Sequence, residues 1–419
     1  MGRFAGARTL GGYLAFAALV RLVGIAVSFG QPWYVLRSIA QSDERGDPHG
    51  ARAILQGSIR TLTRTYALVA AIGVPIALAV VLARGHGGAG AVLLVLTALS
   101  VGGLAFGQVG IDALKARGRT QSALFLEFSI APAFVIVWAA MTSTGGGDAT
   151  IAGLAGAHTL GTLVSAGGSY LLWARDHRVR FGSAKPGVSG EPVAPQGRSL
   201  FSFGVTNLLV VAGPSLPQVL LPFVMTLADV GRVGAAIRLT SIPGVLVVGL
   251  SSLYAPRFAR LAVAGDRPEL RKALRESQTW IATLFLPFAV AFILVPEMIV
   301  PVLGPDFAGT ETALRILGIG QLVNALTGLA PMLLNMCNAE VYVVMATSVS
   351  VVGMGAATIV AGATWGVVGA ATGYAGVVAL RNALIYGKAL RVIRSGPLVP
   401  DRAVTQAAGT ESSRAEGTV

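Results

Sequence analysis

Arginines inside long apolar stretches are the residues of this 419-residue chain best suited to bind a ligand. Arg21, Arg238 and Arg381 each lie within a stretch long enough to span a bilayer, and Arg315 lies near the end of another. A charge in the hydrocarbon layer is costly, so it usually faces protein or a water-filled cavity. A guanidinium binds phosphate oxygens in a fork geometry, which predicts anion-binding positions. A structural role is the alternative for each arginine, and Arg315 fits it best because its side chain can reach the membrane surface.

Amide side chains accompany these arginines. Gln321 and Asn324 are three residues apart, which places them on one face of a helix, and Asn382 directly follows Arg381. Such amides could bond the hydroxyl groups of a sugar. They could equally bond a neighbouring helix, as polar residues of membrane proteins do, and this interpretation is slightly favoured for Gln321 and Asn324.

One glycine and three prolines interrupt the apolar stretch at 200–225. They are Gly213, Pro214, Pro217 and Pro222. Proline removes a backbone hydrogen bond and bends a helix, and broken helices in membranes tend to line cavities. The pattern predicts that this span bends and acts as a gate.

Few residues offer acid–base, metal or cofactor chemistry. Asp112, Glu127, Glu297 and His158 are candidates for proton or sodium coupling, but a place near the end of a span explains the three carboxylates, and packing beside glycines explains the histidine. The single cysteine excludes an internal disulfide, the four histidines lack metal-ligand spacing, and no phosphate-binding GxxxxGK[ST] loop is present. The sequence therefore predicts no catalytic residue, no metal site, no cofactor and no ATPase activity.

The composition is that of a membrane protein. Hydrophobic residues make up 54% of the chain and charged residues 12%, which is about half the charged fraction of a typical soluble protein. The net charge of +13 could indicate a nucleic-acid partner. Basic residues also collect in the cytoplasmic loops of membrane proteins, and the long apolar stretches favour this explanation. No nucleic-acid partner is predicted.

Eleven apolar stretches are predicted to be membrane-spanning helices. They cover residues 10–30, 62–83, 91–111, 123–142, 151–174, 200–225, 233–255, 280–303, 313–336, 341–361 and 365–386. A polar stretch with proline and glycine at 175–198 predicts a cytoplasmic linker. The predicted domains are therefore a five-span lobe at 1–174, this linker, a six-span lobe at 199–392 and a disordered cytoplasmic tail at 393–419.

Lysine and arginine predict the orientation in the membrane. Alternate loops and the tail carry 24 of the 32 Lys and Arg residues, the opposite side carries four, and the spans carry four. Because positive charge accumulates on the cytoplasmic side, the sequence predicts an inner-membrane protein with a cytoplasmic C-terminus and an outside N-terminus.

The two halves of the chain share landmarks at a nearly constant spacing, which indicates an internal repeat. Gly11 matches Gly231 at an offset of 220, and the segment from Gly46 through Ser58 matches the segment from Gly265 through Ser277 at 219. Both matched loops are predicted to be cytoplasmic, so the repeats are parallel. The offset of 220 also pairs Arg238 with a position one helical turn from Arg21, so each half has one arginine at a similar depth.

The first half has five predicted spans and the second has six. We therefore expect that a first helix is missing before residue 10, and that in-frame upstream sequence would encode it. The architecture predicted is an all-α polytopic membrane protein with two parallel six-helix repeats, of which eleven spans are visible.

Short motifs along the chain resemble one known family. GPDF at 304–307, QLVN at 321–324 and LNM at 334–336 are the most specific, and LGGY at 10–13 is a further match. Together they resemble the polysaccharide-transporter (O-antigen flippase-like) branch of the multidrug/oligosaccharidyl-lipid/polysaccharide exporter superfamily. The resemblance covers nearly the whole chain except the tail.

This resemblance implies a V-shaped, two-lobed, MATE-like bundle around a central cavity that opens alternately to each side. It implies that a polyprenyl-diphosphate-linked oligosaccharide is flipped to the outer leaflet for cell-surface polysaccharide assembly. The partners would be membrane lipid, the lipid-linked glycan, and the glycan polymerase and glycosyltransferases of that pathway. The cavity candidates are Arg21, Arg238, Gln321, Asn324, Arg381 and Asn382.

Three other functions compete with this one. A multidrug or small-molecule exporter of the same superfamily would favour acidic residues in the spans, whereas the buried charge here is mostly arginine. A lipid II-type flippase usually has two more helices. A membrane glycan polymerase or ligase needs an ordered extracytoplasmic segment, and the predicted loops on that side are short, so no enzyme is predicted.

Overall fold

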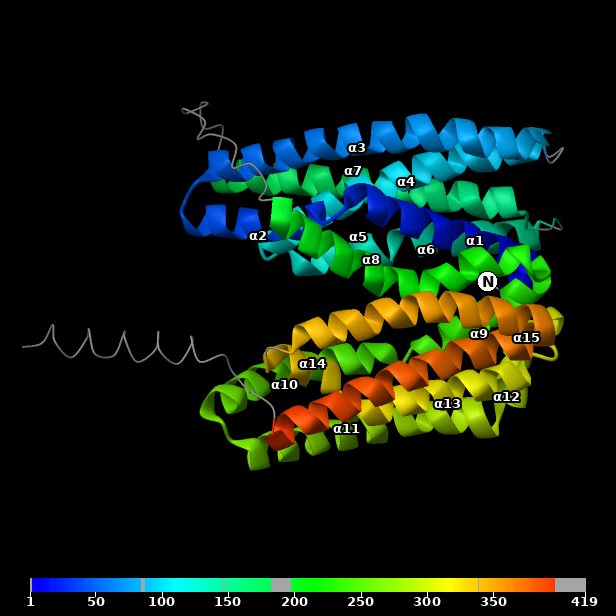
Figure 1. Cartoon of the computed structure of the whole chain (residues 1–419). Helices are drawn as coiled ribbons and strands as arrows, with labels where there is room; N and C mark the ends of the chain where they lie inside the picture. The colour runs from blue at the N-terminus through cyan, green and yellow to red at the C-terminus, as the bar shows by residue number, and fades with distance from the viewer. Residues whose placement is uncertain are drawn as a thin grey trace, which may run out of the picture. The chain divides into compact units, whose positions relative to one another are not determined.

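The computed structural model describes residues 2–83, 87–145, 147, 149–181, 197–337 and 339–395. Within these residues every regular element is a helix (Figure 1). The elements are α1 (Gly2–Ser28), α2 (Gln31–Glu44), α3 (Pro48–Ala83), α4 (Gly87–Ala116), α5 (Thr120–Phe128), α6 (Ile130–Thr144), α7 (Ile151–Phe181), α8 (Gly197–Leu220), η1 (Leu221–Phe223), α9 (Leu227–Ser241), α10 (Gly244–Ala264), α11 (Arg267–Leu294), α12 (Pro296–Leu303), η2 (Pro305–Phe307), α13 (Glu311–Thr327), α14 (Ala330–Met336) and α15 (Glu340–Ser395).

Contacts divide the chain into two compact units. Unit 1 comprises Met1–Gly231 with Leu303–Asp306, and unit 2 comprises Arg232–Val302 with Phe307–Val419. This boundary differs from the predicted linker at 175–198. α8 was expected to open the second lobe, but it packs against α1 and α2 and so belongs to unit 1.

Both ends of the predicted linker are helical. Residues 175–181 continue α7 as helix, and α8 already begins at Gly197. Residues 182–196 of the linker and 396–419 of the predicted tail lie outside the described residues.

In unit 1, glycines let α1 approach the start of α9 with backbone against backbone. A Cβ atom on Gly11 would lie 1.8 Å from the carbonyl oxygen of Leu227, and one on Gly231 would lie 2.0 Å from the carbonyl oxygen of Ala7. Only glycine fits at either position. Ala7 and Leu227, like Gly11 and Gly231, are 220 residues apart, so this contact joins equivalent positions of the internal repeat.

Small residues also set the distance between α4 and α7 in unit 1. A Cβ on Gly103 would lie 2.9 Å from Thr162 Oγ1, and one on Gly110 would lie 2.2 Å from Ser169 Oγ. Small residues allow helices in membranes to approach closely, and these helices form the most extensive pair of the unit.

The matched loops of the two halves have the same local structure. Gly46 and Gly265 both adopt the left-handed conformation, with φ of 67° and 69°. The aspartate after each glycine accepts a hydrogen bond from the backbone N–H three residues on, at 2.8 Å for Asp47 and 3.0 Å for Asp266. Glycine stops one helix and aspartate starts the next in both halves, which confirms the repeat at this position.

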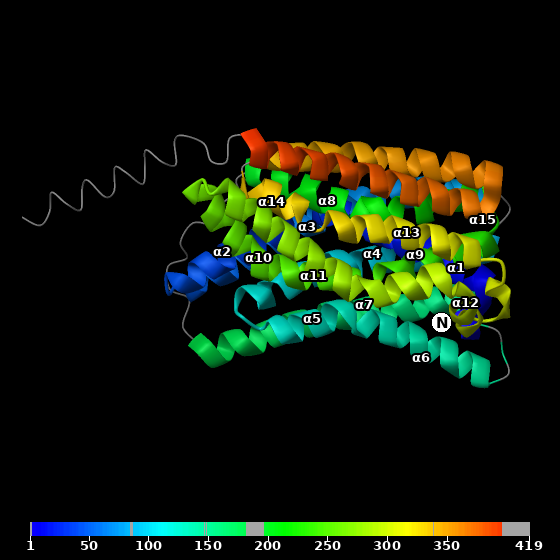
Figure 2. The same cartoon turned by 90° about the horizontal axis from the view of Figure 1, so that it is seen from below.

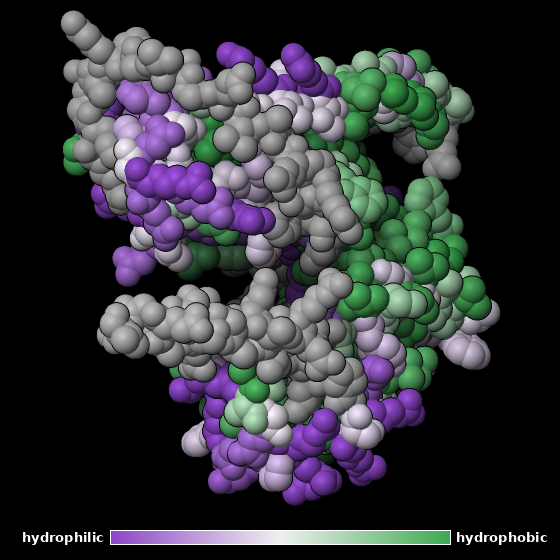
Figure 3. All heavy atoms as spheres, turned by 60° about the vertical axis from the view of Figure 1, so that its left-hand side comes forward, coloured by the Kyte–Doolittle hydropathy of each residue, from purple (hydrophilic) through white to green (hydrophobic). Residues whose placement is uncertain are grey.

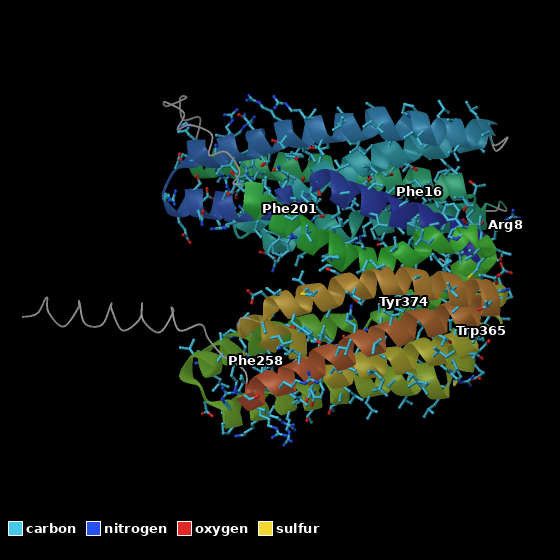
Figure 4. All side chains as sticks on the ribbon, in the orientation of Figure 1. Arg8, Phe16, Phe201, Phe258, Trp365 and Tyr374 are labelled. Atoms are coloured by element: carbon cyan, nitrogen blue, oxygen red, sulfur yellow. The ribbon has the colours of Figure 1, made fainter. Side chains whose placement is uncertain are left out.

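The apolar core of unit 2 lies where α10, α11, α14 and α15 meet. Phe258, Leu270 and Leu333 are completely buried there, with Leu274 at 1% exposure (Phe258 is labelled in Figure 4). Burial of side chains this large is the main favourable term in such packing. This core fixes the helices that carry the polar residues described below.

α15 is a helical hairpin with two long arms, drawn in orange and red in Figure 1. The turn is at Trp365 and Gly366, and Gly366 has φ of 59°, a conformation that favours glycine. The arms then touch through glycine, because a Cβ on Gly369 would lie 1.9 Å from the carbonyl oxygen of Ala361. The hairpin contains the last two of the predicted spans.

In the described part of the chain, seven helical stretches are long and apolar enough to cross a membrane by length and composition. They are α1, α3, α4, α5 with α6, α11, α13 with α14, and α15. The predicted spans outside this set lie on α7, on α8 with η1, and on α9 with α10. All eleven predicted spans therefore fall on helices, and the chain is a multi-pass membrane protein.

Apolar side chains point outward along these helices. On α3, Leu68, Ile72 and Ile76 recur every four residues and are 57–62% exposed. A soluble protein would bury such a stripe, whereas a helix in lipid leaves it on the surface. Figure 3 shows hydrophobic residues covering a flank, while hydrophilic residues gather on the end that faces the viewer.

Candidate functional site

Four of the six predicted cavity residues form one hydrogen-bonded network in unit 2. Asn382 Nδ2 donates to Asn324 Oδ1 at 2.8 Å, and Asn324 Nδ2 donates to Gln321 Oε1 at 3.1 Å. Arg381 donates to Asn382 Oδ1 from both Nε and Nη2, at 3.3 Å each. We call these four residues the polar network.

Close packing of α13 on the second arm of α15 brings the network together. A Cβ on Gly320 would lie 2.8 Å from the Cβ of Ala375, so the two helices nearly touch one turn before Asn324. Gln321 and Asn324 then face Asn382 across the helix pair. The amide contacts agree with the interhelical role favoured from the sequence.

The arginine of the network has donors to spare. A guanidinium has five N–H groups, and the two hydrogen bonds of Arg381 within the network both go to a single oxygen of Asn382. Among the described residues no carboxylate forms an ion pair with it. Arg381 is half-buried, whereas Asn382 is 4% exposed. A half-buried cation without an anionic partner is costly in a membrane helix, and a bound anion would remove that cost.

The other two predicted cavity residues lie outside this network. Arg21 is exposed on α1 in unit 1, and Arg238 is exposed on α9 in unit 2. Their predicted place on one substrate path stays a prediction.

Arg315 has the structural role favoured from the sequence. Its Nη2 pairs with Glu297, and its Nε donates to the carbonyl oxygen of Ile293 at 3.2 Å. The arginine thus ties α13 to the end of α11 and the start of α12. Glu297, a candidate for ion coupling, is used in this contact.

No family model and no curated protein matches the sequence. Solved structures do match its fold. An inward-facing multidrug resistance MATE family transporter of the MOP superfamily has a TM-score of 0.74 at 15% identity, over 93% of each chain. The chain has the MATE fold.

Two further structures support the same fold. A MATE protein in complex with MaD3S has a TM-score of 0.60 at 14% identity, over 93% of this chain and 89% of that one. A MOP superfamily transporter from Pyrococcus furiosus has a TM-score of 0.58 at 15% identity, again over 93% and 89%. That protein is described as having a binding pocket of reverse polarity, which suggests a different function.

The predicted gate of this MATE fold lies on α8 and η1. α8 continues as helix through Gly213, Pro214 and Pro217 and ends at Leu220, and Pro222 lies in the 3-10 turn that follows. The change from α-helix to 3-10 helix therefore occurs at the turn that contains Pro222 and not at the earlier prolines. Whether the segment bends during a transport cycle stays a prediction.

Two of the coupling candidates share a lysine that the sequence interpretation did not single out. Lys115 Nζ lies 2.8 Å from Asp112 Oδ1 and 2.8 Å from Glu127 Oε2, and Gln108 donates to Glu127 at 3.2 Å. The spacing of three residues between Asp112 and Lys115 was a readable sign of this pair. His158 is half-buried, and its Nδ1 bonds the Tyr13 hydroxyl at 3.1 Å.

A second group of charged residues that sequence reasoning missed joins α2, the α4–α5 turn and α7. The Arg117 side chain is fully buried, and its Nε donates to Asp43 at 3.1 Å. Its guanidinium lies 4.8 Å from the centre of the Trp173 ring, and Trp173 stacks on His177 at 5.0 Å. These residues come from three separate segments, so no local spacing revealed them.

His177 is neutral in this group. Arginine only donates, so the 3.0 Å contact from Arg117 Nη2 requires His177 Nδ1 to accept. Burial lowers the pKa of His177 below its ordinary value, and the charges of Arg117 and Arg52 lower it further.

The arrangement offers no metal chemistry in the part of the chain that the structure describes. No group of three or more His, Cys, Asp or Glu residues could hold a metal ion there. What the site offers is a guanidinium and amides within a membrane helix bundle, which suits an anion that also carries hydroxyl groups.

Proposed function

We propose that this chain is a transporter that flips a polyprenyl-diphosphate-linked oligosaccharide from the cytoplasmic to the outer leaflet for cell-surface polysaccharide assembly. The MATE fold supports transport as the general activity. Arg381 is the reason for proposing an anionic substrate, because it is a half-buried arginine in a membrane helix without a carboxylate partner among the described residues. A diphosphate supplies the negative charge that this position lacks.

The amides of the polar network fit the sugar part of such a substrate. Gln321 and Asn324 are half-buried, and each has an amide N–H donor that its hydrogen bonds within the polar network do not use. Amides that already hold one another in place lose little freedom when a sugar hydroxyl binds. The network would thus position a sugar next to a bound diphosphate.

Export of cationic drugs is the second candidate, because the solved structures with a similar fold include a multidrug resistance transporter. A cationic drug needs a carboxylate, and Asp112 and Glu127 are both held by Lys115. The Pyrococcus furiosus protein has a similar fold, and the reverse polarity of its binding pocket suggests a different function for it. A lipid II-type flippase and a glycan polymerase or ligase remain the more distant alternatives.

Under this proposal the protein lies in the inner membrane with a cytoplasmic C-terminus. It acts on membrane lipid and the lipid-linked glycan. Glycosyltransferases would supply its substrate, and a glycan polymerase would use its product.

The test is to delete the gene and restore it as wild type, Arg381→Gln or Arg391→Gln. Arg391 is the matched control, because it is an exposed arginine near the end of the same helix. Lipid-linked oligosaccharide is quantified by mass spectrometry. We expect it to accumulate on deletion, and we expect wild type and R391Q, but not R381Q, to restore its normal level.

Two results would speak against the proposal. An unchanged pool of lipid-linked glycan together with increased sensitivity to cationic drugs would favour the exporter. Full restoration by R381Q would show that Arg381, on which the proposal of a diphosphate rests, is not needed to bind the substrate.

A further inference from the structure

A cavity of about 310 Å³ lies in unit 1 at the end of α4, beside the start of α5 and the last turns of α7. Figure 2 shows α5 running alongside α7 in this region. The polar wall of the cavity consists of Arg119, Ser122, Arg175 and Asp176. This volume is at the lower end of the range of small-molecule pockets, roughly 300–1,000 Å³.

The polar wall carries a net positive charge. Asp176 is buried and accepts from Arg119 Nε at 2.9 Å, and Arg117 lies 3.7 Å from its other oxygen. Arg175 is exposed and forms no ion pair with any described carboxylate. Two arginines therefore face the cavity against one aspartate, and Arg175 supplies the uncompensated charge.

The remaining wall is apolar and continues onto the outer surface of α7. Leu114, Leu172 and Val179 line the cavity. Leu172 is 39% exposed and Val179 is 74% exposed, and Leu171 next to them is 73% exposed. The cavity thus has charge on one side and exposed hydrocarbon on the other. A soluble anion would contact only the charged side, whereas a lipid would contact both sides.

The frame of the cavity is held in place by buried interactions. Asp176 is fixed by two arginines, and Arg117 in turn is held by Asp43 and the ring of Trp173. A site whose supporting side chains are fixed loses little entropy when it binds a ligand. Asp176 and the Arg119 guanidinium that pairs with it are therefore held in position before a ligand binds.

We propose that this cavity binds the phosphate headgroup of an anionic phospholipid of the surrounding membrane. Arg175 and Arg119 face the phosphate, Ser122 offers a hydroxyl, and the acyl chains leave along the exposed leucines of α7. The location agrees with this, because α4 is one of the helices long and apolar enough to span the membrane and the cavity lies at its end. The site is separate from the polar network and does not depend on what is transported.

The test uses the purified full chain in detergent and counts retained lipids by native mass spectrometry. Phosphatidylglycerol is compared with phosphatidylcholine of the same acyl chains, for wild type, Arg175→Gln, Leu172→Trp and Arg178→Gln. Arg178 is the matched control, since it is an exposed arginine of α7 that does not line the cavity. We expect about tenfold weaker retention of phosphatidylglycerol in R175Q and in L172W, which fills the cavity, and no change in R178Q.

The melting temperature of each variant without lipid shows whether it is folded. Equal retention of both lipids by wild type would overturn the proposal, and so would an equal loss in R178Q and R175Q, which indicates diffuse attraction. Stabilisation of wild type by inorganic phosphate to the same degree as by phosphatidylglycerol would show that the site takes free phosphate, which also contradicts the lipid assignment.

Discussion

Lys115 neutralises two carboxylates at once. Its ammonium group lies 2.8 Å from Asp112 and 2.8 Å from Glu127, and the three side chains are between 7% and 23% exposed. Removing one partner of a buried charged group leaves the other charge uncompensated, which costs more than the pair contributes. The stability of this part of unit 1 should therefore depend on the balance of charges rather than on the number of ion pairs.

Replacement of Lys115 by methionine tests that balance. We expect K115M to lower the free energy of unfolding by about 1–3 kcal/mol, because two neighbouring carboxylates lose their common cation. The triple variant D112N/K115M/E127Q should recover most of the loss, since no charge remains unpaired. Thermal melting in detergent measures both. A triple variant less stable than K115M would show that the ion pairs themselves stabilise the fold.

His177 gives the group around Arg117 a pH dependence. Its pKa is lowered by burial and by the charges of Arg117 and Arg52, with Asp43 opposing and His49 adding to the effect. The unfolded chain, with an ordinary pKa of about 6.5, takes up the proton first as the pH falls. The stability that neutral His177 contributes is therefore present above about pH 6.5 and is lost as the pH falls toward the lowered pKa.

Melting curves of wild type and His177→Gln between pH 7.5 and 5 measure this effect, with His158→Gln as a second histidine variant. We expect the melting temperature of wild type to fall below about pH 6.5 and that of H177Q to fall less. Parallel curves for wild type and H177Q would contradict the assignment.

Some contacts of the polar network were readable in the sequence and others were not. The spacing of Gln321 and Asn324 placed them on one face, and their hydrogen bond follows from that spacing. The bond from Asn382 to Asn324 joins residues 58 apart in the chain and depends on how closely α13 packs on α15. Such packing is a tertiary property, and no local pattern reports it.

At the scale of elements, glycine decides how closely helices approach. Gly11 was found in the sequence as a repeat landmark, but its reason appears only in the structure. A Cβ there would meet the backbone of α9, which cannot rotate away as a side chain could. The same offset that marked Gly11 and Gly231 in the sequence thus marks a backbone contact in unit 1.

We expect Gly11→Ala to destabilise the protein by about 1–3 kcal/mol through this overpacking. Gly57→Ala on α3 is the matched control, because no atom of the described residues lies within 4 Å of a Cβ at that position. Alanine in a helix should there be neutral or stabilising by up to about 1 kcal/mol. Thermal melting of the two variants decides the matter. Equal melting temperatures would mean that the backbone around Gly11 and Leu227 makes room for the added Cβ without loss of stability.

Element boundaries were predicted less well than element identity. α3 begins at Pro48 and α11 at Arg267, each more than ten residues before the predicted span. Hydropathy marks only the part of a helix that lies in lipid, and these helices continue beyond it with arginine-rich turns. α2 was missed for the same reason, since it is a short helix with charged and apolar residues mixed.

At the scale of the whole molecule, the all-helical MATE fold was predicted from the sequence and the structure confirms it. The boundary between compact units was not predicted, because α8 packs with the helices of the first half although it follows the linker. Hydropathy along the chain shows where the spans lie but not which spans pack together. Within this fold, the polar residues determine which ligands the protein can bind.

The proposed function is the movement of a lipid-linked diphosphate glycan across the membrane, and it requires Arg381. The most direct measurement places the purified protein in liposomes that contain a polyprenyl-diphosphate oligosaccharide and follows its exposure to a membrane-impermeant sugar oxidant. We predict that wild type and R391Q bring the inner-leaflet glycan into reach of the oxidant and that R381Q does so at least about tenfold more slowly. Liposomes with wild-type protein that leave the glycan protected but transport a cationic dye would contradict the proposed function.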